Sequence, residues 1–232
     1  MHKIGIIGAM ELEVEALKAQ MNIIGESNKA GMTFYEGTLG QTEIVIVRCG
    51  IGKVNAAICV QILADLYSVT HVINTGVAGS LNATLDIGDI VISRDVIHHD
   101  MDVSALGYAR GQVPQMDTLA FPGDDGLIRL ALDCSAEANP GLHTVIGRIV
   151  SGDQFISDKA TKNQLITEFH PDCTEMEGAA IAHAAYLNGL PFVIIRAISD
   201  KADDSAEMDY PTFERKAADH CARLVESLVR KL

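Results

Sequence analysis

The sequence predicts an α/β fold, specifically a three-layer α/β/α sandwich with a central mixed sheet. Short apolar runs typical of strands alternate with segments of helical spacing along all 232 residues. The clearest run is Pro191–Asp200, PFVIIRAISD, in which four consecutive bulky apolar residues indicate a strand buried on both faces. We find no linker, repeat or low-complexity segment, so we expect residues 1–232 to form a single domain.

The first half of the chain supplies strands that end in glycine turns. A short apolar run at Lys3–Ile7 predicts a strand that ends at Gly8, and near-helical apolar spacing predicts a helix at Glu11–Gln20. Two further strands flank a tight turn at Gly40-Gln41. The remaining elements expected here are a long, mostly buried helix at Lys53–Leu66, a strand from Thr70 that runs into a glycine turn, and a strand from Ile87.

The second half interrupts this alternation once. Residues Asp100–Asp124 contain glycine, proline and isolated apolar residues without a period, and such long irregular excursions are usually functional or interfacial. Alternation then resumes with a helix at Leu127–Ala138, a strand within His143–Ile156, a helix at Asp158–Phe169, a short strand or loop at Pro171–Gly178 and a helix at Gly178–Leu187. Tyr210-Pro211 is expected to begin the last helix, with Leu224, Leu228 and Val229 on its inner face.

The charge of the chain excludes several classes of partner. Its formal net charge is −13, from 18 basic and 31 acidic residues, which repels nucleic-acid phosphates and anionic lipid. No apolar run approaches the roughly 20 residues of a membrane span. The amino terminus enters a strand pattern without the apolar core of a signal peptide. We therefore expect a cytoplasmic protein that binds neither nucleic acid nor membranes.

Motifs for metals and cofactors are weak. The five cysteines are widely spaced with no C-x-x-C pair, so we expect buried free thiols rather than a zinc site. Neighbouring side chains of an extended segment point to opposite faces, which argues against a metal site at His98–Asp102. The glycine turns at Gly5–Gly8 and Thr75–Gly79 lack the dinucleotide fingerprint and the P-loop lysine. We expect neither a metal nor a cofactor.

Three carboxylates follow strand-to-loop junctions: Glu13, Glu177 and Asp200. Because ligands bind beyond the carboxyl ends of parallel strands, we expect these side chains to surround one cleft. Crowded carboxylates shift one another's pKa values, as general acids and bases require. Each also has an ordinary structural explanation. Glu13 and Glu177 could stabilise helix dipoles, and Asp200 could cap a helix.

Six motifs connect these features in one order and at characteristic spacings: GIIGAMELEVEAL, CGIGKV, VINTGVAG, VSGDQFI, EMEGAAIAH and VIIRAISD. Together they closely resemble the 5′-methylthioadenosine/S-adenosylhomocysteine nucleosidases of the purine nucleoside phosphorylase superfamily, from Lys3 to the last helix. The resemblance implies a nucleoside-phosphorylase-like fold and no cofactor. It also implies hydrolysis of the N-glycosidic bond, which releases adenine and a 5-thio-substituted ribose.

The resemblance further implies roles for individual residues. Glu13 would activate the attacking water, and Asp200, oriented by Ser199, would protonate N7 of the leaving adenine. A carboxylic acid keeps its proton near neutrality only if burial or neighbouring carboxylates raise its pKa. The other implied contacts are Glu177 to the ribose hydroxyls, Met176 against the sugar, Phe155 stacked on adenine, Ile156 reading the adenine edge through its backbone, Ala78 and Gly79 at the purine–ribose junction, and Met10, Ile51 and Tyr210 at the sugar and 5′ side.

The first loop favours water over phosphate as the nucleophile. A phosphorylase usually holds phosphate with arginines in the first loop and before the glycine turn, and this chain has Met10–Glu13 and Ile73–Thr75 there. Two positions depart from the family pattern: Val77 replaces a common serine, and Leu106 replaces a common aromatic residue. The excursion resembles the segment that closes the neighbouring subunit's 5′-thio pocket. We therefore expect a homodimer in which Leu106 and Pro114 complete the neighbour's site.

The residues leave three alternatives open. A phosphorylase would require phosphate and form ribose 1-phosphate, and a sibling nucleosidase would prefer futalosine or deoxyadenosine. A catalytically inactive nucleoside-binding protein would bind without turnover, although the retention of all three carboxylates argues against it. The motifs do not rank methylthioadenosine against S-adenosylhomocysteine, and they do not place Arg196 inside or behind the cleft.

Overall fold

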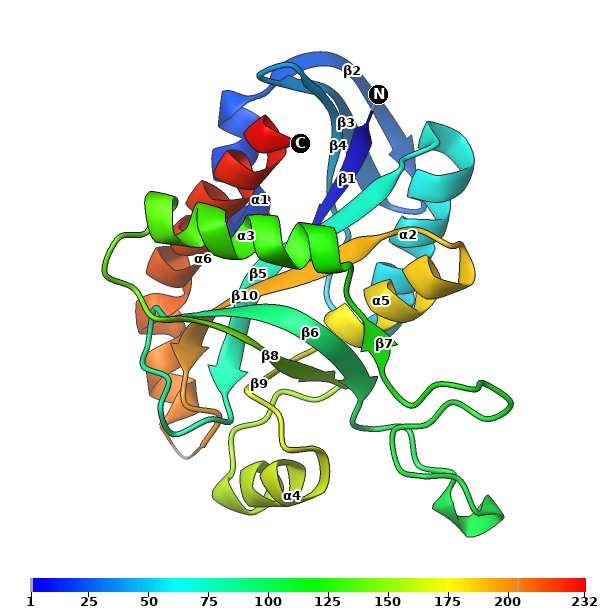
Figure 1. Ribbon diagram of the computed structural model, residues 1–232, viewed down its shortest axis with the longest axis vertical. Helices are drawn as coiled ribbons and strands as arrows, with labels where there is room; N and C mark the ends of the chain where they lie inside the picture. Colours follow the sequence, from blue (N-terminus) through cyan, green and yellow to red (C-terminus); the bar gives the residue numbers. More distant parts are fainter. Residues whose placement is uncertain (1, 204) are drawn as a thin grey trace.

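The computed structural model describes residues 2–203 and 205–232 and shows a central sheet between layers of helices (Figure 1). Its strands are β1 (Lys3–Gly8), β2 (Asn22–Lys29), β3 (Met32–Leu39), β4 (Thr42–Arg48), β5 (His71–Ser80), β6 (Ile90–His98), β7 (Phe121–Pro122), β8 (Thr144–Ser151), β9 (Cys173–Glu175) and β10 (Phe192–Asp200). Its helices are α1 (Glu11–Gln20), α2 (Lys53–Tyr67), the 3₁₀ helix η1 (Ser104–Leu106), α3 (Asp125–Ala138), α4 (Lys159–Phe169), α5 (Gly178–Leu187) and α6 (Ala206–Lys231).

The described strands form one sheet in the order β10-β6-β8-β9-β5-β1-β4-β3-β2, with β7 paired to β6. Strand β10 also pairs with β5, so that β5, β10, β6, β8 and β9 close on themselves as a small barrel. Strand β1 is parallel to β4 and β5, and β5 is parallel to β10, whereas the pairs β10–β6 and β5–β9 are antiparallel. The predicted mixed sheet is confirmed. The carboxyl ends of β1, β5 and β10 lie at the same edge.

Helices cover both faces of the sheet (Figure 1). Helices α1 and α6 bury Val14 and Leu228 in an apolar cluster on one face, together with α3. Helices α2 and α5 bury Val60 and Ile181 in a second cluster on the other face. A smaller cluster around Leu165 lies under α4. Each fully buried aliphatic side chain stabilises the fold by roughly 1.5–3 kcal/mol, so the two large clusters hold the three layers together.

Two of the longer elements differ from the expectations. Strand β2 was not expected, because its residues are exposed or half-buried and lack the alternating burial that marks a strand. Helix α6 begins at Ala206, so Pro211 lies inside the helix rather than at its first position. A proline within the first two turns removes one intrahelical hydrogen bond, and its fixed φ angle still suits the helix. The proposed start at Tyr210 was therefore wrong.

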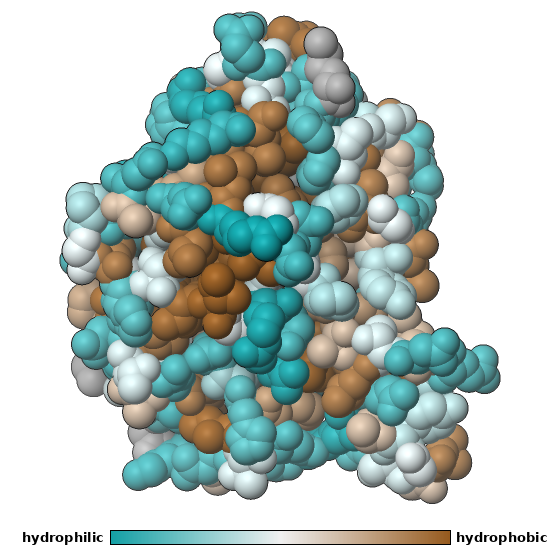
Figure 2. All heavy atoms as spheres, viewed as in Figure 1, coloured by the Kyte–Doolittle hydropathy of each residue, from teal (hydrophilic) through white to brown (hydrophobic). Residues whose placement is uncertain are grey.

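The excursion between β6 and β7 projects away from the body of the molecule at the lower right of Figure 1. Figure 2 shows apolar and polar side chains mixed on the surface of this projection. No helix among the described residues is long and apolar enough to cross a membrane. The five cysteines are buried and free, as the sequence predicted.

Candidate active site

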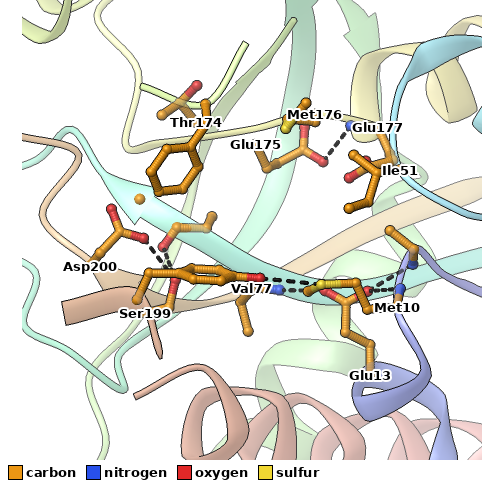
Figure 3. A pocket seen from close by; sticks show the side chains of 15 residues that line it. Met10, Glu13, Ile51, Val77, Thr174, Glu175, Met176, Glu177, Ser199 and Asp200 are labelled. Atoms are coloured by element: carbon orange, nitrogen blue, oxygen red, sulfur yellow. Dashed lines mark hydrogen bonds between the residues drawn. The ribbon is translucent and has the colours of Figure 1, made fainter. Parts of the chain in front are cut away.

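A cavity of about 340 Å³ opens at the carboxyl ends of β1, β5, β9 and β10 (Figure 3). Its volume is within the usual range of small-molecule sites. The lining residues come from segments far apart in the sequence: Ala9, Met10, Glu13, Ile51, Val77, Ala78, Gly79, Phe155, Thr174, Glu175, Met176, Glu177, Ser199, Asp200 and Tyr210. The three carboxylates that the sequence selected therefore surround one cleft.

Glu13 connects the segment that follows β1 with β5 at one end of the cavity. Its Oε2 accepts hydrogen bonds from the backbone N–H groups of Ala9 (2.7 Å) and Met10 (2.9 Å), and its Oε1 accepts one from Val77 (3.1 Å) on β5. A Cβ atom at Gly76 would lie 2.6 Å from this oxygen, so only glycine allows the approach. Glu13 does occupy the first turn of α1, where a carboxylate stabilises the helix dipole. Its hydrogen bond from Val77 on β5 is a further contact, which a role at the helix dipole does not explain.

Burial raises the pKa of Glu13, although the nearby Arg196 guanidinium and the three backbone donors act in the opposite direction. The backbone N–H of Val77 also bears on the replacement of a common serine by valine at this position. The side chain at this position makes no hydrogen bond, but its N–H supports Glu13 whatever side chain is present.

Arg196 lies behind the cavity rather than in it. The side chain is 2% exposed, and its NH2 group donates to the carboxylate of Glu175 and to the side-chain oxygen of Asn74. Glu175 also accepts from the Ser151 hydroxyl and from the N–H groups of Glu177 (3.0 Å) and Gly178 (2.7 Å). Burial alone would raise the pKa of Glu175, but Arg196 and these donors hold it below its ordinary value. Arg196 therefore keeps Glu175 ionised.

Glu177 occupies the N-cap position of α5, and its side chain lines the cavity. Its Oε1 accepts the backbone N–H of Gly52 at 2.8 Å. Burial and the neighbouring charge of Glu175 raise the pKa of Glu177 to about 8. The pKa values of the two glutamates of the EMEG motif are thus shifted in opposite directions, because Glu175 contacts Arg196 directly and Glu177 does not.

Asp200 lies at the other end of the cavity from Glu13 (Figure 3). Its Oδ1 accepts the backbone N–H of Ala202 at 2.8 Å, and its Oδ2 accepts the Ser199 hydroxyl at 2.9 Å. Burial raises the pKa of Asp200 against these two hydrogen bonds. Ser205 occupies the N-cap position of α6, so the alternative that Asp200 caps a helix was wrong.

Apolar side chains form the walls between these carboxylates. The rings of Phe155 and Tyr210 meet edge to face with centroids 5.7 Å apart, and the Tyr210 hydroxyl donates to Sδ of Met10 at 3.2 Å. Phe155 and Ile51 are about half exposed at the rim. An aromatic face beside a carboxyl group suits a flat, heteroaromatic ligand.

The remaining predicted residues fall into two groups. Ile156 is buried and lines a small hollow that shares Phe155 and Asp200 with the main cavity. Leu106 is 75% exposed in η1, and Pro114 is half-buried in the excursion, so neither lines the cavity of its own chain. Sequence reasoning did not assign Ala9, Thr174 or Glu175. For Glu175 the signal was present, since it lies two residues before Glu177.

The lining is acidic and lacks fixed positive charge. Within the described part of the chain, the residues at the cavity wall include Glu13, Glu175, Glu177 and Asp200 but no lysine or arginine. Carboxyl groups whose pKa values differ, placed on either side of a cavity, can serve as an acid and a base in one reaction. An anionic nucleophile would be repelled.

Residues 3–230 of the chain match the family model of the phosphorylase superfamily. The 5′-methylthioadenosine/S-adenosylhomocysteine nucleosidase of Halalkalibacterium halodurans is 45% identical, with 100% of both chains covered. The nucleosidase of the same name from Neisseria meningitidis, in complex with methylthio-immucillin-A, superposes with a TM-score of 0.96 at 39% identity and covers 100% of both chains. Futalosine hydrolase of Helicobacter pylori gives a TM-score of 0.94 at 33% identity, covering 100% of this chain and 98% of that one.

The chain therefore belongs to the phosphorylase superfamily and, within it, to the family of 5′-methylthioadenosine/S-adenosylhomocysteine nucleosidases.

Proposed function

We propose that the protein is an N-glycosyl hydrolase that cleaves 5′-methylthioadenosine and S-adenosylhomocysteine to adenine and the 5-thio-substituted ribose. The observation that carries this proposal is the placement of Glu13 and Asp200 in one apolar-walled cavity, with different hydrogen-bond partners at its two ends. Relatives of the same name at 45% and 39% identity support the choice of substrate.

Asp200 is the general acid in this mechanism. Adenine leaves poorly as an anion, so its N7 must receive a proton as the glycosidic bond breaks. The raised pKa of Asp200 keeps that proton available near neutrality, and the Ser199 hydroxyl fixes the orientation of the carboxyl group. Phe155 stacks on the adenine ring, and the backbone of Ile156 contacts its edge.

Glu13 activates the water that attacks the anomeric carbon. Three backbone N–H groups hold its carboxylate in place, so the base is oriented before substrate enters. Positive charge develops on the ribose as the bond to adenine breaks, and the carboxylates at this end stabilise it. Glu177 binds the ribose hydroxyls and Met176 packs on the sugar. Ala78 and Gly79 lie at the purine–ribose junction, while Met10, Ile51 and Tyr210 face the sugar and its 5′ substituent.

Water rather than phosphate is the nucleophile. The wall of the cavity presents carboxylates, and the nearby Arg196 is already engaged by Glu175 and Asn74. A phosphate ion beside Glu13 would meet repulsion without a compensating cation.

A second copy of the chain completes the 5′ pocket in our proposal. Leu106 lies in η1 on the projecting excursion and is 75% exposed, so its apolar side chain is available to pack against a second copy. Pro114 belongs to the same excursion. The excursion of one protomer would cover the 5′ side of its partner's cavity.

A sibling activity towards futalosine is the second candidate, because a futalosine hydrolase is among the close structural relatives. Both activities cleave a bond to a purine-like base and differ in the base and the 5′ substituent.

The test is release of free base from purified protein in phosphate-free buffer, with methylthioadenosine, S-adenosylhomocysteine and futalosine compared by kcat/KM. We expect adenine and 5-methylthioribose from methylthioadenosine without added phosphate. Formation of ribose 1-phosphate only when phosphate is present would favour a phosphorylase. A kcat/KM that is highest for futalosine would favour the sibling activity, and tight binding without product would favour a binding protein.

A further inference from the structure

The loop between β8 and α4, residues 152–158, carries Phe155 in its middle. Among the residues that the structure describes, this loop makes hydrogen bonds at Gly152, Asp153 and Asp158, and none at residues 154–157. The position of the half-exposed Phe155 ring therefore depends on how the ends of the loop are held.

Asp153 connects this loop to two other segments: the start of the excursion, and the amino-terminal end of α2, which follows the cavity residue Ile51. Its backbone N–H donates to Oδ2 of Asp100 at 3.0 Å, at the point where β6 gives way to the excursion. Oδ1 of Asp100 binds the Lys53 ammonium at 2.6 Å. The backbone N–H of Lys53 donates in turn to Oδ1 of Asp153 at 2.8 Å. We call this closed set of three contacts, among Lys53, Asp100 and Asp153, the polar clasp.

The clasp shares the amino-terminal end of α2 with the ribose-binding region. Helix α2 has Gly52 at its N-cap and no capping side chain of its own. Two carboxylates from distant segments accept its first N–H groups instead: Glu177 accepts from Gly52, and Asp153 accepts from Lys53. Gly52 has a φ angle of 97°, which a side chain would strain. One helix end thus binds both Glu177 and the loop that carries Phe155.

A contribution to the stability of the fold does not by itself explain the polar clasp. A partly exposed ion pair contributes little to the stability of a fold, and the side chains of Lys53 and Asp100 are 21% and 18% exposed. Lys3 and Glu36 form a comparable pair at 3.0 Å within the sheet. Unlike this pair, the clasp joins three segments that are distant in the sequence, two of which border the cavity, so its distinctive effect is on their relative position.

We propose that the polar clasp is a positioning device, which fixes the Phe155 loop relative to the helix end that holds Glu177. Lys53, Asp100 and Asp153 act through other residues and do not touch substrate. The consequence for catalysis rests on the base-stacking role proposed for Phe155. The position of the loop itself can be measured without any substrate.

The chain contains no tryptophan, so Phe155→Trp places a single fluorophore on the loop. Acrylamide quenching of Trp fluorescence is then compared in this variant alone and in combination with Lys53→Met or Asp153→Ala. We expect the quenching constant to rise roughly twofold or more in both combinations, because each substitution removes one of the three contacts that hold the loop. Lys53→Arg should restore the original value, since it keeps the cation.

Two matched control variants distinguish an effect on the Phe155 loop from a general increase in the flexibility of the protein. Lys3→Met removes the comparable ion pair in the sheet, and Asp158→Ala removes the other carboxylate of the same loop that accepts a helix N–H. Lys3→Met should leave quenching unchanged, and Asp158→Ala should change it less than Asp153→Ala does. Unchanged quenching in Lys53→Met and Asp153→Ala, or an equal rise in Lys3→Met, would overturn the proposal.

Kinetics then test the link to catalysis. In the otherwise unaltered chain, Asp153→Ala should raise KM for methylthioadenosine roughly tenfold while kcat changes by less than about threefold. Combined with Phe155→Ala, it should lower kcat/KM little further, because both changes remove the same contact. Additive losses would contradict a role through Phe155. If no variant or parent releases adenine, the proposed function fails while the quenching result still decides the clasp.

Discussion

The two ends of the cavity hold their carboxylates by different means. At the Glu13 end, three backbone N–H groups and the nearby Arg196–Glu175 pair surround the carboxyl group. At the Asp200 end, one backbone N–H and one hydroxyl are the hydrogen-bond donors, and the neighbouring charges that act on its pKa are Asp209 and Asp203. Burial raises the pKa at both ends, but only the Glu13 end has a cation to oppose it.

This difference suits a reaction that needs a base and an acid together. A cation and several fixed donors favour a carboxylate, whereas an apolar setting with acidic neighbours favours a carboxylic acid. The fold achieves the separation with one strand, since β10 supplies both Arg196 behind Glu13 and Asp200 at its own end.

The largest effect is expected at the acid end. Asp200→Asn removes the proton donor while keeping the shape of the side chain, and it should lower kcat for methylthioadenosine by roughly 10³–10⁴-fold. Adenine release measured under saturating substrate checks this. Asp158→Asn, in the Phe155 loop but outside the cavity, should retain activity because asparagine also caps helices. A loss below tenfold in Asp200→Asn would mean that another group protonates adenine.

At the base end, Glu13→Gln should reduce kcat by roughly 10²–10³-fold, because the amide still occupies the site but accepts no proton. Glu11 provides a matched control, since it lies in the same first turn of α1 and forms a surface ion pair with Lys18. Glu11→Gln should leave kcat unchanged. Equal kcat values for the two glutamine variants would show that Glu13 is not the catalytic base.

The support behind Glu13 can be tested through stability. Arg196→Met leaves Glu175 buried without its cation and should lower the free energy of unfolding by about 3–5 kcal/mol, as measured by denaturant titration. The double variant Arg196→Met/Glu175→Gln should lose less than the sum of the single changes, because no unpaired charge is left. Additive losses would show that the two side chains act independently.

The smallest effect concerns pH. The pKa of Glu177 is about 8 in the folded protein and ordinarily 4.5, so the folded state keeps a proton that the unfolded chain releases. Its contribution to stability is therefore present at low pH and is lost as pH rises from about 4.5 towards 8. Glu177→Gln should make the unfolding free energy decline less over this range, because glutamine does not titrate. Parallel pH profiles for the variant and the parent would contradict this assignment.

The sequence predicted the architecture well because its strands are buried on both faces and carry unambiguous apolar runs. Pro191–Asp200 is the clearest case, and the structure buries all nine residues of β10. Periodicity failed where burial is absent. Strand β2 has no buried face, and its pairing with β3 comes from backbone hydrogen bonds that leave no pattern in the side chains.

The residues of the site could be predicted from the sequence, but the hydrogen bonds and ion pairs among them could not. Strand ends locate Glu13, Glu177 and Asp200 at one sheet edge by topology alone. The ion pair between Arg196 on β10 and Glu175 on β9 depends on how the strands close into a barrel, which the periodicity of the sequence does not specify. The same limit hid the polar clasp, whose members were visible only as an apparent metal motif and a glycine turn.

Strand β2 also bears on how copies of the protein behave when crowded. It is the outer edge of the sheet, and Ile23 and Ile24 on it are 47% and 74% exposed. Such an edge can recruit a strand from another molecule and begin aggregation. A register shift between Ile23 and Gly25 interrupts the edge, and the charges of Glu26 and Lys29 follow within a few residues. The register shift and the nearby charges thus make this edge a poor template for a strand from another molecule.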